Sequence, residues 1–315
     1  MMFLSATLCH LTVCQTSAKD LNFRVSPMRT AYLLVSHGSS DPRHQAGLTR
    51  LAQGVRQQLS RGHQSTQITI RPESAPWRSR PPAADLDTES PIVGTATLEA
   101  AEQSLAEQIV QFSRSLSQLD IQQLVIVPLF LLAGIHVKED LPAEIGCAQQ
   151  QLRSGVSIKC LPYLGSRPQF KQHIATRIAK TKADRCLLLA HGSRRPAGNR
   201  AIQQLGRGLD TDIAFWTVPP DLETQVYHLM QRGHQHIAIA PFFLFPGSIT
   251  DAITHRTEQI AEHLPKLSLR LLSPLGTNSE LGAVIADIIQ SAWPSVTAMN
   301  GGAEVLSIAD NSVTA

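Results

Sequence analysis

The sequence predicts an α/β protein made of two similar lobes, each with a central parallel sheet flanked by helices. Apolar runs rich in leucine and β-branched residues, such as Ala31–Val35 and Leu124–Leu132, are typical of strands buried on both faces. Segments with apolar residues three or four positions apart, as at 43–60, predict helices that bury one face. Each apolar run ends abruptly at a turn that contains glycine and histidine.

The strand and turn pattern occurs twice, which favours two tandem lobes over one continuous sheet. The matching segments are AYLLVSHGSSDPR at 31–43 and CLLLAHGSRRP at 186–196, LVIVPLFLLAGIH at 124–136 and IAIAPFFLFPGSI at 237–249, and CLPYLG at 160–165 and LLSPLG at 271–276. Within the first half we expect strands at 31–35, 92–99, 124–132 and 158–164, and helices at 43–60, 104–116 and from Val137 onward.

We expect an N-terminal lobe at 28–170 and a C-terminal lobe at 180–295. Residues 61–91 contain five prolines among serines and charged residues, which indicates a loop-like insertion in the first lobe. Residues 1–27 lack the basic and small-residue features of a signal peptide, so they are interpreted as a disordered extension or an over-called start. Residues 296–315 are expected to form a disordered tail.

Composition argues against several functional classes. Hydrophobic residues make up 43% and charged residues 17%, as in ordinary globular proteins. A net charge of +3 without a basic run argues against nucleic-acid binding. No apolar run approaches the roughly 20 residues of a membrane span, so we expect no membrane partner. The five cysteines are scattered, which argues against a zinc ribbon or iron–sulfur cluster and favours a reducing, cytoplasmic location.

Histidines at two predicted strand ends are the candidate catalytic residues. His37 lies in a Ser-His-Gly-Ser turn, where Gly38 permits a tight bend. His136 has Asp140 four residues later, on the same helical face, where a carboxylate would orient the imidazole. Ligand crevices of open α/β sheets lie at the carboxyl ends of the strands, so we expect the two imidazoles to face each other. Taken alone, each histidine has the alternative interpretation of a turn or cap residue.

Two glutamates follow the middle predicted strand of the same lobe. Glu99 ends that strand and Glu102 lies about one helical turn further on. The alternative interpretation is that both are solvent-exposed glutamates at the start of a helix, where the helix dipole favours negative charge. Two imidazoles and one carboxylate suit a borderline divalent metal such as cobalt or iron. Imidazoles also accept protons near neutral pH.

The second half of the chain serves as an internal control. His191 matches His37, whereas Ile249 occupies the position of His136 and Thr217 falls near the position of Glu99. The second half therefore retains one candidate ligand. We expect the first lobe to be catalytic and the second to form a structural or substrate-binding wall.

The motifs strand-S-H-G-S and P-L-F-L-x-x-G-x-H-x-x-x-D resemble those of class II tetrapyrrole chelatases, specifically the long, two-repeat sirohydrochlorin cobalto- and ferrochelatases. The resemblance covers about Ala31 to Trp293, although the Pro-rich insertion departs from the compact family pattern. It implies a pair of α/β lobes, each with a central parallel sheet, that face each other across a cleft holding the macrocycle.

The resemblance also implies roles for individual residues. His37 and His136 would be metal ligands, His37 also a proton acceptor, and Glu99 would assist metal delivery or proton removal. The substrate carboxylates would pair with basic residues beside the motifs, for which the alternative is ordinary surface charge. These basic residues are Arg43, Lys138, Arg194 and Arg195. The tetrapyrrole would be lined by Glu102, Phe130, Leu131, Leu132, Ala133, Gly134 and Ile135.

The predicted function is insertion of Co²⁺ or Fe²⁺ into sirohydrochlorin with release of two protons, for cobalamin or sirohaem biosynthesis. The metal would be a substrate, and we expect no tightly bound cofactor. One alternative is a metal-binding or metal-delivery protein without turnover. Another is a phosphate- or nucleotide-binding α/β protein, which no G-x-G-x-x-G or Walker motif supports. The sequence leaves open the physiological metal and the oligomeric state, a two-lobed monomer or a homo-oligomer.

Overall fold

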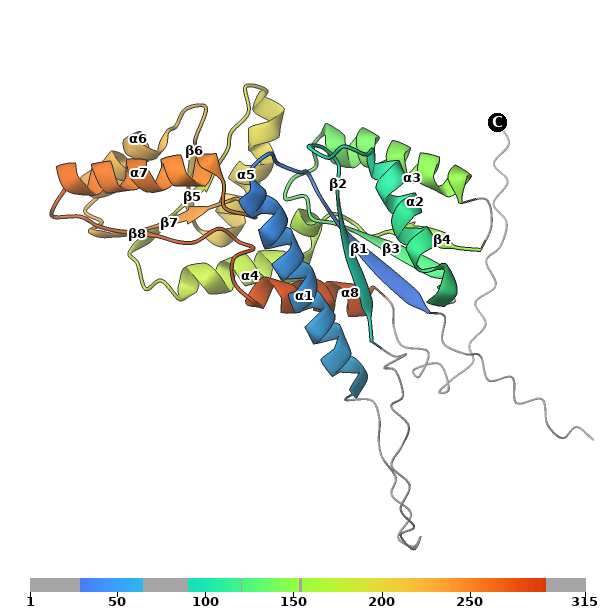
Figure 1. The fold of residues 1–315 in the computed structure, drawn as a ribbon. Coiled ribbons are helices and arrows are strands. Elements are labelled where there is room, and N and C mark those ends of the chain that lie inside the picture. The colour runs from blue at the N-terminus through green and yellow to red at the C-terminus, as the bar shows by residue number, and fades with distance from the viewer. Residues whose placement is uncertain (1–28, 65–89, 120, 153–154, 293–315) are drawn as a thin grey trace, which may run out of the picture.

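Two lobes lie side by side, each built on a four-stranded parallel sheet (Figure 1). This architecture confirms the predicted fold class. The computed structural model describes residues 29–64, 90–119, 121–152 and 155–292. The predicted N-terminal extension, most of the Pro-rich insertion and the predicted C-terminal tail lie outside these described residues.

The elements alternate between strands and helices along the chain. The first sheet and its helices comprise β1 (Thr30–Ser36), α1 (Pro42–Gln64), β2 (Ile92–Thr97), α2 (Leu105–Ser115), β3 (Gln123–Pro128), α3 (Leu141–Gln151) and β4 (Ser157–Cys160). After α4 (Pro168–Ala179) come β5 (Arg185–Ala190), α5 (Pro196–Leu209), β6 (Asp212–Phe215), α6 (Leu222–Gln231), β7 (His236–Pro241), α7 (Ser248–His263), β8 (Ser268–Leu271) and α8 (Glu280–Ser291). Short helical turns are η1 (Ser117–Leu119), η2 (His136–Asp140) and η3 (Leu164–Ser166).

The two sheets have the same strand order. The first is β2-β1-β3-β4 and the second β6-β5-β7-β8, with every neighbouring pair parallel. Parallel neighbours need crossover connections, which the helices provide. The carboxyl ends of β1, β2 and β3 therefore meet at one edge, where ligand sites of such sheets form.

Strand β1 shows how the pattern of buried residues builds the layers. Leu33 and Leu34 are 1% and 0% exposed, and their side chains point to opposite faces of the sheet. Leu33 belongs to an apolar cluster with Ile109 of α2 and Leu141 of α3. Leu34 belongs to another cluster that includes Leu48 of α1. Both faces of the strand are thus covered, which explains its unbroken apolar sequence.

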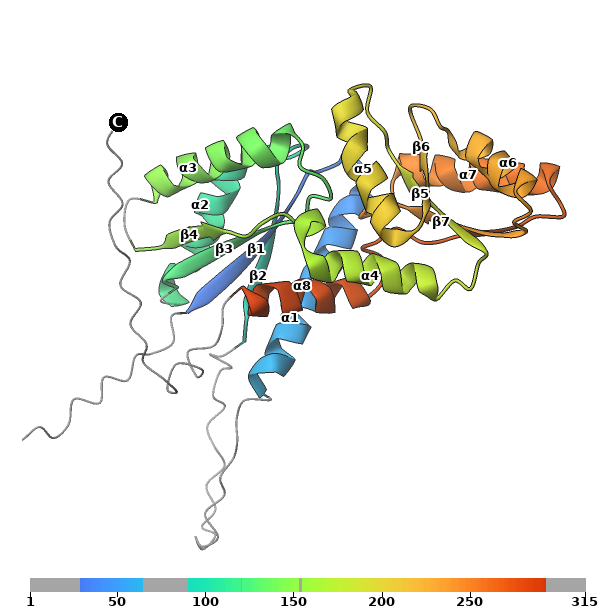
Figure 2. The ribbon, with the colours of Figure 1, turned by 180° about the vertical axis from the view of Figure 1, so that it is seen from behind.

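The last helix of each repeat packs across the boundary between the lobes. Ile174 of α4 lines a small space together with Leu188 and Ala240 of the second sheet. Helix α8 crosses α1 closely, because a Cβ at Gly282 would lie 3.1 Å from the carbonyl carbon of Gly54. Figure 2 shows α4 beneath the second lobe and α8 beside α1. One apolar cluster consequently runs through both lobes.

Three predicted strands extend beyond the strands in the structure. The predicted strand at 92–99 ends at Thr97, that at 124–132 ends at Pro128, and that at 158–164 ends at Cys160. Leu129 and Phe130 are still only 3% and 8% exposed, because the chain remains in the core after it leaves the sheet. Apolar content reports burial and does not by itself distinguish a strand from a buried loop.

Phe245 packs between the lobes. It follows β7 in the second lobe, is 7% exposed, and meets His44 of α1 edge-to-face with ring centroids 5.0 Å apart. Gly47 of α1 leaves room for the ring, since a Cβ there would lie 2.6 Å from it. This aromatic ring therefore fills space that both lobes share.

Replacing Phe245 with alanine is expected to lower the free energy of unfolding by about 3–5 kcal/mol, because it leaves a cavity in the shared core. Urea denaturation followed by circular dichroism measures this change. The control is Tyr227→Ala on α6, where the side chain is 37% exposed; it should cost less than about 1 kcal/mol. Equal losses in the two variants would contradict a packing role for Phe245.

Candidate metal site

Three neighbouring strands of the first sheet deliver His37, Glu99 and His136 to one place. His37 is the first residue after β1, Glu99 lies two residues after β2, and His136 begins the helical turn that follows β3. One ligand atom from each residue can be chosen so that all three lie within 4.8 Å of one another. The structure thus brings together the residues that the sequence proposed as catalytic.

Backbone hydrogen bonds fix the first two of these residues. The N–H of Leu98 donates to the carbonyl of Ser36 (2.9 Å), and the N–H of Glu99 donates to the carbonyl of His37 (2.8 Å). Gly38 has φ of +102°, and a Cβ at this position would lie 1.9 Å from the carbonyl oxygen of Glu99. Only glycine fits both the dihedral angle and the space.

A π-helical turn and a carboxylate position His136. The turn η2 spans His136–Asp140 and leads directly into α3. Such turns are rare and are frequent at functional sites. His136 Nδ1 and Asp140 Oδ2 are 2.8 Å apart, so the predicted pairing of these two side chains is present. An Nδ1–H that donates to Asp140 leaves the lone pair of His136 on Nε2.

The two imidazoles meet through their Nε2 atoms. These atoms are 3.2 Å apart, and the ring planes lie at 81° with centroids 4.6 Å apart. Two nitrogen ligands of one ion at ~2.1 Å would be separated by about 3.0–3.4 Å in tetrahedral or octahedral geometry. With the lone pair of His136 turned toward His37, the contact is favourable when a proton or a cation lies between the rings.

Glu99 lies beside both rings without a hydrogen bond to either. Its Oε2 is 3.8 Å from Nδ1 of His37, and its Oε1 is 3.8 Å from Nδ1 of His136. The carboxylate therefore places negative charge next to any proton or metal ion that the imidazoles take up. The side chains of His37, Glu99 and His136 are 49%, 53% and 30% exposed, so the site is open to solvent.

His44 is a neighbour of the site that the sequence interpretation missed. It lies in the first turn of α1, where burial against the second lobe lowers its pKa and the nearby His37 lowers the pKa further. The Asp41 carboxylate opposes this shift, and the net effect favours the neutral form of the His44 imidazole. A helix-start histidine gives no signal that separates it from a surface residue, because its burial depends on Phe245.

The predicted tetrapyrrole-lining residues differ in how much surface they offer. Phe130 is 8% exposed and packs in the first-lobe core. Leu131 and Leu132 are half-buried. Ile135 is 52% exposed, a high value for a large apolar side chain. The remaining predicted contacts are all exposed: Glu102, Ala133, Gly134 and Lys138.

Arg43 is held by carboxylates from both lobes. Its guanidinium donates to both oxygens of Asp41 (3.0 and 2.6 Å) and to both oxygens of Asp251 in the first turn of α7 (3.0 and 2.7 Å). Its donors are thus already engaged within the protein. Binding a substrate carboxylate, as predicted from the sequence, would require exchange of these partners. Asp251 could not be assigned to Arg43 from sequence, since 208 positions separate them.

The second lobe repeats the backbone of the site with different side chains. The N–H of Thr217 donates to the carbonyl of His191 (3.0 Å), as that of Glu99 does to His37. Gly192 has φ of +87° and corresponds to Gly38. Thr217 therefore occupies the position of Glu99. No second cluster of three metal-ligating groups was found in the part of the chain that the structure describes.

Comparison with known proteins identifies the family. The CbiX family model matches residues 83–181 and again residues 185–292. The chain belongs to the CbiX family. The family match confirms the predicted resemblance and the two-repeat organisation. Its first segment begins at residue 83, within the Pro-rich insertion, so His37 lies outside it.

Two curated relatives are similar over part of their length. The sirohydrochlorin ferrochelatase of Priestia megaterium is 25% identical over 152 residues, 44% of this chain and 57% of the relative. The chloroplastic sirohydrochlorin ferrochelatase of Arabidopsis thaliana is 28% identical over 118 residues, 34% and 52% of the two chains. This CbiX-family chain thus spans about half the length of the curated relatives it matches.

Solved structures share the fold. SirB from Bacillus subtilis with Fe³⁺ has a TM-score of 0.61 at 18% identity, covering 86% of this chain and 98% of that one. SirB from Bacillus subtilis subspecies spizizenii in complex with cobalt has a TM-score of 0.57 at 17% identity, covering 84% and 96%. At these identities the comparison shows the CbiX fold alone. Among the helices of the described ranges, none has the length and apolar character needed to span a membrane.

Gly38→Ala is expected to displace Glu99 from His37 and to lower the free energy of unfolding by more than about 1 kcal/mol, because alanine is strained at positive φ. Urea denaturation and Co²⁺ titration measure the two effects. Gly146→Ala in α3 is the control, since a Cβ there meets nothing within 4 Å. If Gly38→Ala binds Co²⁺ and unfolds like the control, the close approach to Glu99 is unimportant.

Arg43 is expected to contribute stability that disappears in acid. Its guanidinium holds the pKa of Asp41 at about 2, below the ordinary 3.8, and also lowers the pKa of Asp251. The contribution is therefore complete above about pH 4 and is lost as the pH falls toward about 2. In urea denaturation, the free energy of unfolding of Arg43→Ala should be lower than that of wild type by an amount that is constant at neutral pH and decreases below about pH 4.

Arg50→Ala is the matched control for this pH series. Arg50 is exposed on α1 and forms no ion pair with any described residue. Its effect on stability should not change with pH. If Arg43→Ala lowers the free energy of unfolding by the same amount in acid and at neutral pH, the ion-pair interpretation is contradicted.

Proposed function

We propose that this CbiX-family protein is a sirohydrochlorin chelatase that inserts Co²⁺ or Fe²⁺ into the tetrapyrrole with release of two protons. The observation that carries the proposal is the Nε2–Nε2 separation of 3.2 Å between His37 and His136, with Glu99 beside both rings. Two imidazoles and one open carboxylate can hold a divalent ion without enclosing it. The names of the curated relatives support the choice of substrate.

The reaction needs a site that holds the ion loosely and removes two pyrrole protons. The Nε2 atoms of His37 and His136 take the ion from water and then release it to the macrocycle. As the ion leaves, the same atoms are free to accept protons. The carboxylate of Glu99, 3.8 Å from each ring, balances the charge at both stages. Asp140 keeps Nδ1 of His136 engaged so that Nε2 faces the reaction.

The metal is a substrate in this proposal, and no resident cofactor takes part. The protein would act in the cytoplasm in cobalamin or sirohaem biosynthesis. The ligand set suits both cobalt and iron, and affinity order alone does not select between them. The two lobes on one chain are compatible with a monomer.

Loss of one imidazole tests the proposal. An anaerobic absorbance assay follows insertion of Co²⁺ or Fe²⁺ into sirohydrochlorin by wild type, His136→Ala and His191→Ala. His136→Ala should lower kcat/KM by about 100-fold or more, because it removes a metal ligand and a proton acceptor. His191→Ala should stay close to wild type, because Thr217 and Ile249 replace its partners.

Other outcomes reject the proposal or part of it. Equal losses in the two variants would mean that both lobes share the chemistry. Binding of Co²⁺ by wild type without any insertion would favour a metal-delivery protein. Circular dichroism of each variant verifies that the exposed substitutions leave the fold intact.

A further inference from the structure

The first turn after β5 shares a backbone-to-side-chain hydrogen bond with the first turn after β1 and is more basic. In the first lobe the N–H of Asp41 donates to Oγ of Ser39 (3.1 Å), and in the second the N–H of Arg195 donates to Oγ of Ser193 (3.1 Å). This shared hydrogen bond aligns Ser39 with Ser193 and Asp41 with Arg195. Where the first lobe has Ser40, Asp41 and Ala46, the second has Arg194, Arg195 and Arg200.

The basic turn is held rigidly. Asn199 of α5 accepts from the N–H of Ser193 (2.8 Å) and donates to the carbonyl of the same residue (2.8 Å). Gly198 lets the helix approach this closely, because a Cβ there would lie 2.9 Å from the Cβ of Ser193. A turn that is already ordered in this way loses less conformational entropy when its side chains bind a ligand.

Arg194 and Arg200 line a cavity of about 350 Å³ beside this turn. Asn199 lines it from α5 and Val218 from the loop after β6, and no carboxylate is among its lining residues. Neither arginine forms an ion pair with any residue that the structure describes. Arg43, by contrast, is occupied by two aspartates of its own protein. Within the described residues, the second lobe thus has guanidinium groups without an ion-pair partner beside this turn, whereas the guanidinium beside the corresponding turn of the first lobe is neutralised.

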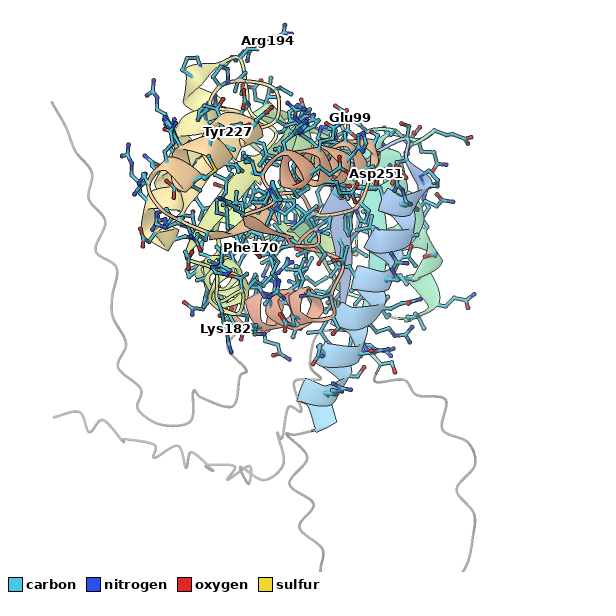
Figure 3. The ribbon with its side chains drawn as sticks, turned by 90° about the vertical axis from the view of Figure 1, so that its left-hand side faces the viewer. Glu99, Phe170, Lys182, Arg194, Tyr227 and Asp251 are labelled. Carbon is cyan, nitrogen blue, oxygen red and sulfur yellow. The ribbon has the colours of Figure 1, made fainter. Side chains whose placement is uncertain are left out.

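Acidic residues are distributed in the opposite way. The matching backbone hydrogen bonds align Thr217 with Glu99, and hence Pro220 with Glu102. The repeated strand segments align Ile253 with Asp140. Figure 3 shows Glu99 and Arg194 at the same end of the molecule. One lobe therefore presents carboxylates around the imidazoles, and the other presents guanidinium groups at the same end.

We propose that this cavity is an anion subsite in which Arg194 and Arg200 bind a carboxylate side chain of the tetrapyrrole. The inference rests on the proposed function for the identity of the ligand. Guanidinium groups pair with carboxylates through two parallel hydrogen bonds, which also orient the partner. The first lobe then handles the metal ion and protons, and the second lobe holds the anionic periphery of the macrocycle.

Binding of metal-free sirohydrochlorin to the full chain tests the subsite directly, with absorbance or fluorescence as readout. The double variant Arg194→Ala/Arg200→Ala should raise the Kd for sirohydrochlorin by about tenfold or more, since each charge-assisted bond to a charged group is lost. The KM for Co²⁺ in the insertion assay should stay at the wild-type value. The dependence of Kd on salt should also become weaker.

Arg207→Ala is the control, because it removes one guanidinium, as each single substitution does, from the exposed far end of α5, away from the cavity. It should leave Kd unchanged. A double variant that binds sirohydrochlorin like wild type, or a control that weakens binding equally, overturns the subsite. Wild type that binds sirohydrochlorin and inserts no metal rejects the proposed function, and the Kd comparison still decides the subsite.

Discussion

The close approach of Gly38 to the carbonyl of Glu99 is the constraint on which the site depends. Three parallel strands end side by side, but their side chains converge only because the hydrogen bonds of the sheet continue past the strand ends. That continuation forces the backbone after His37 into a positive φ angle and against the next loop. Gly38 thus determines how the His37 imidazole and the Glu99 carboxylate lie relative to each other. Asp140 fixes the third side chain, His136, through its contact with Nδ1.

The same backbone device occurs in the second lobe and carries different chemistry. Gly192 repeats the positive φ, and Thr217 repeats the hydrogen bond to the residue after the strand. The fold therefore separates scaffold from function, since the backbone geometry is conserved between the lobes while the side chains at the sheet edges differ. The edge of the first lobe carries Glu99, His136 and Asp140, and the edge of the second lobe carries Arg194 and Arg200 at α5.

The sequence was informative where local rules operate. Strand positions, the turn at Ser-His-Gly-Ser and the i,i+4 pairing of His136 with Asp140 all follow from short-range geometry, and the structure contains them. Three strands end earlier than predicted, at Thr97, Pro128 and Cys160, because the residues after a strand can be as apolar as the strand itself. The partners of Arg43 and His44 depend on how the second lobe docks on α1, which no local pattern encodes.

The crossing of α4 and α8 has a consequence for how the two halves relate as folding units. The final helix of each repeat packs against the other repeat. At Gly54 and Gly282 the backbones of α1 and α8 are in contact. A half-length chain would expose apolar surface of α1 and of its sheet to water unless a second copy supplied the missing helix. Two half-chains that exchanged their final helices would cover the same core. The two repeats of this single chain are therefore arranged like the two subunits of a domain-swapped dimer.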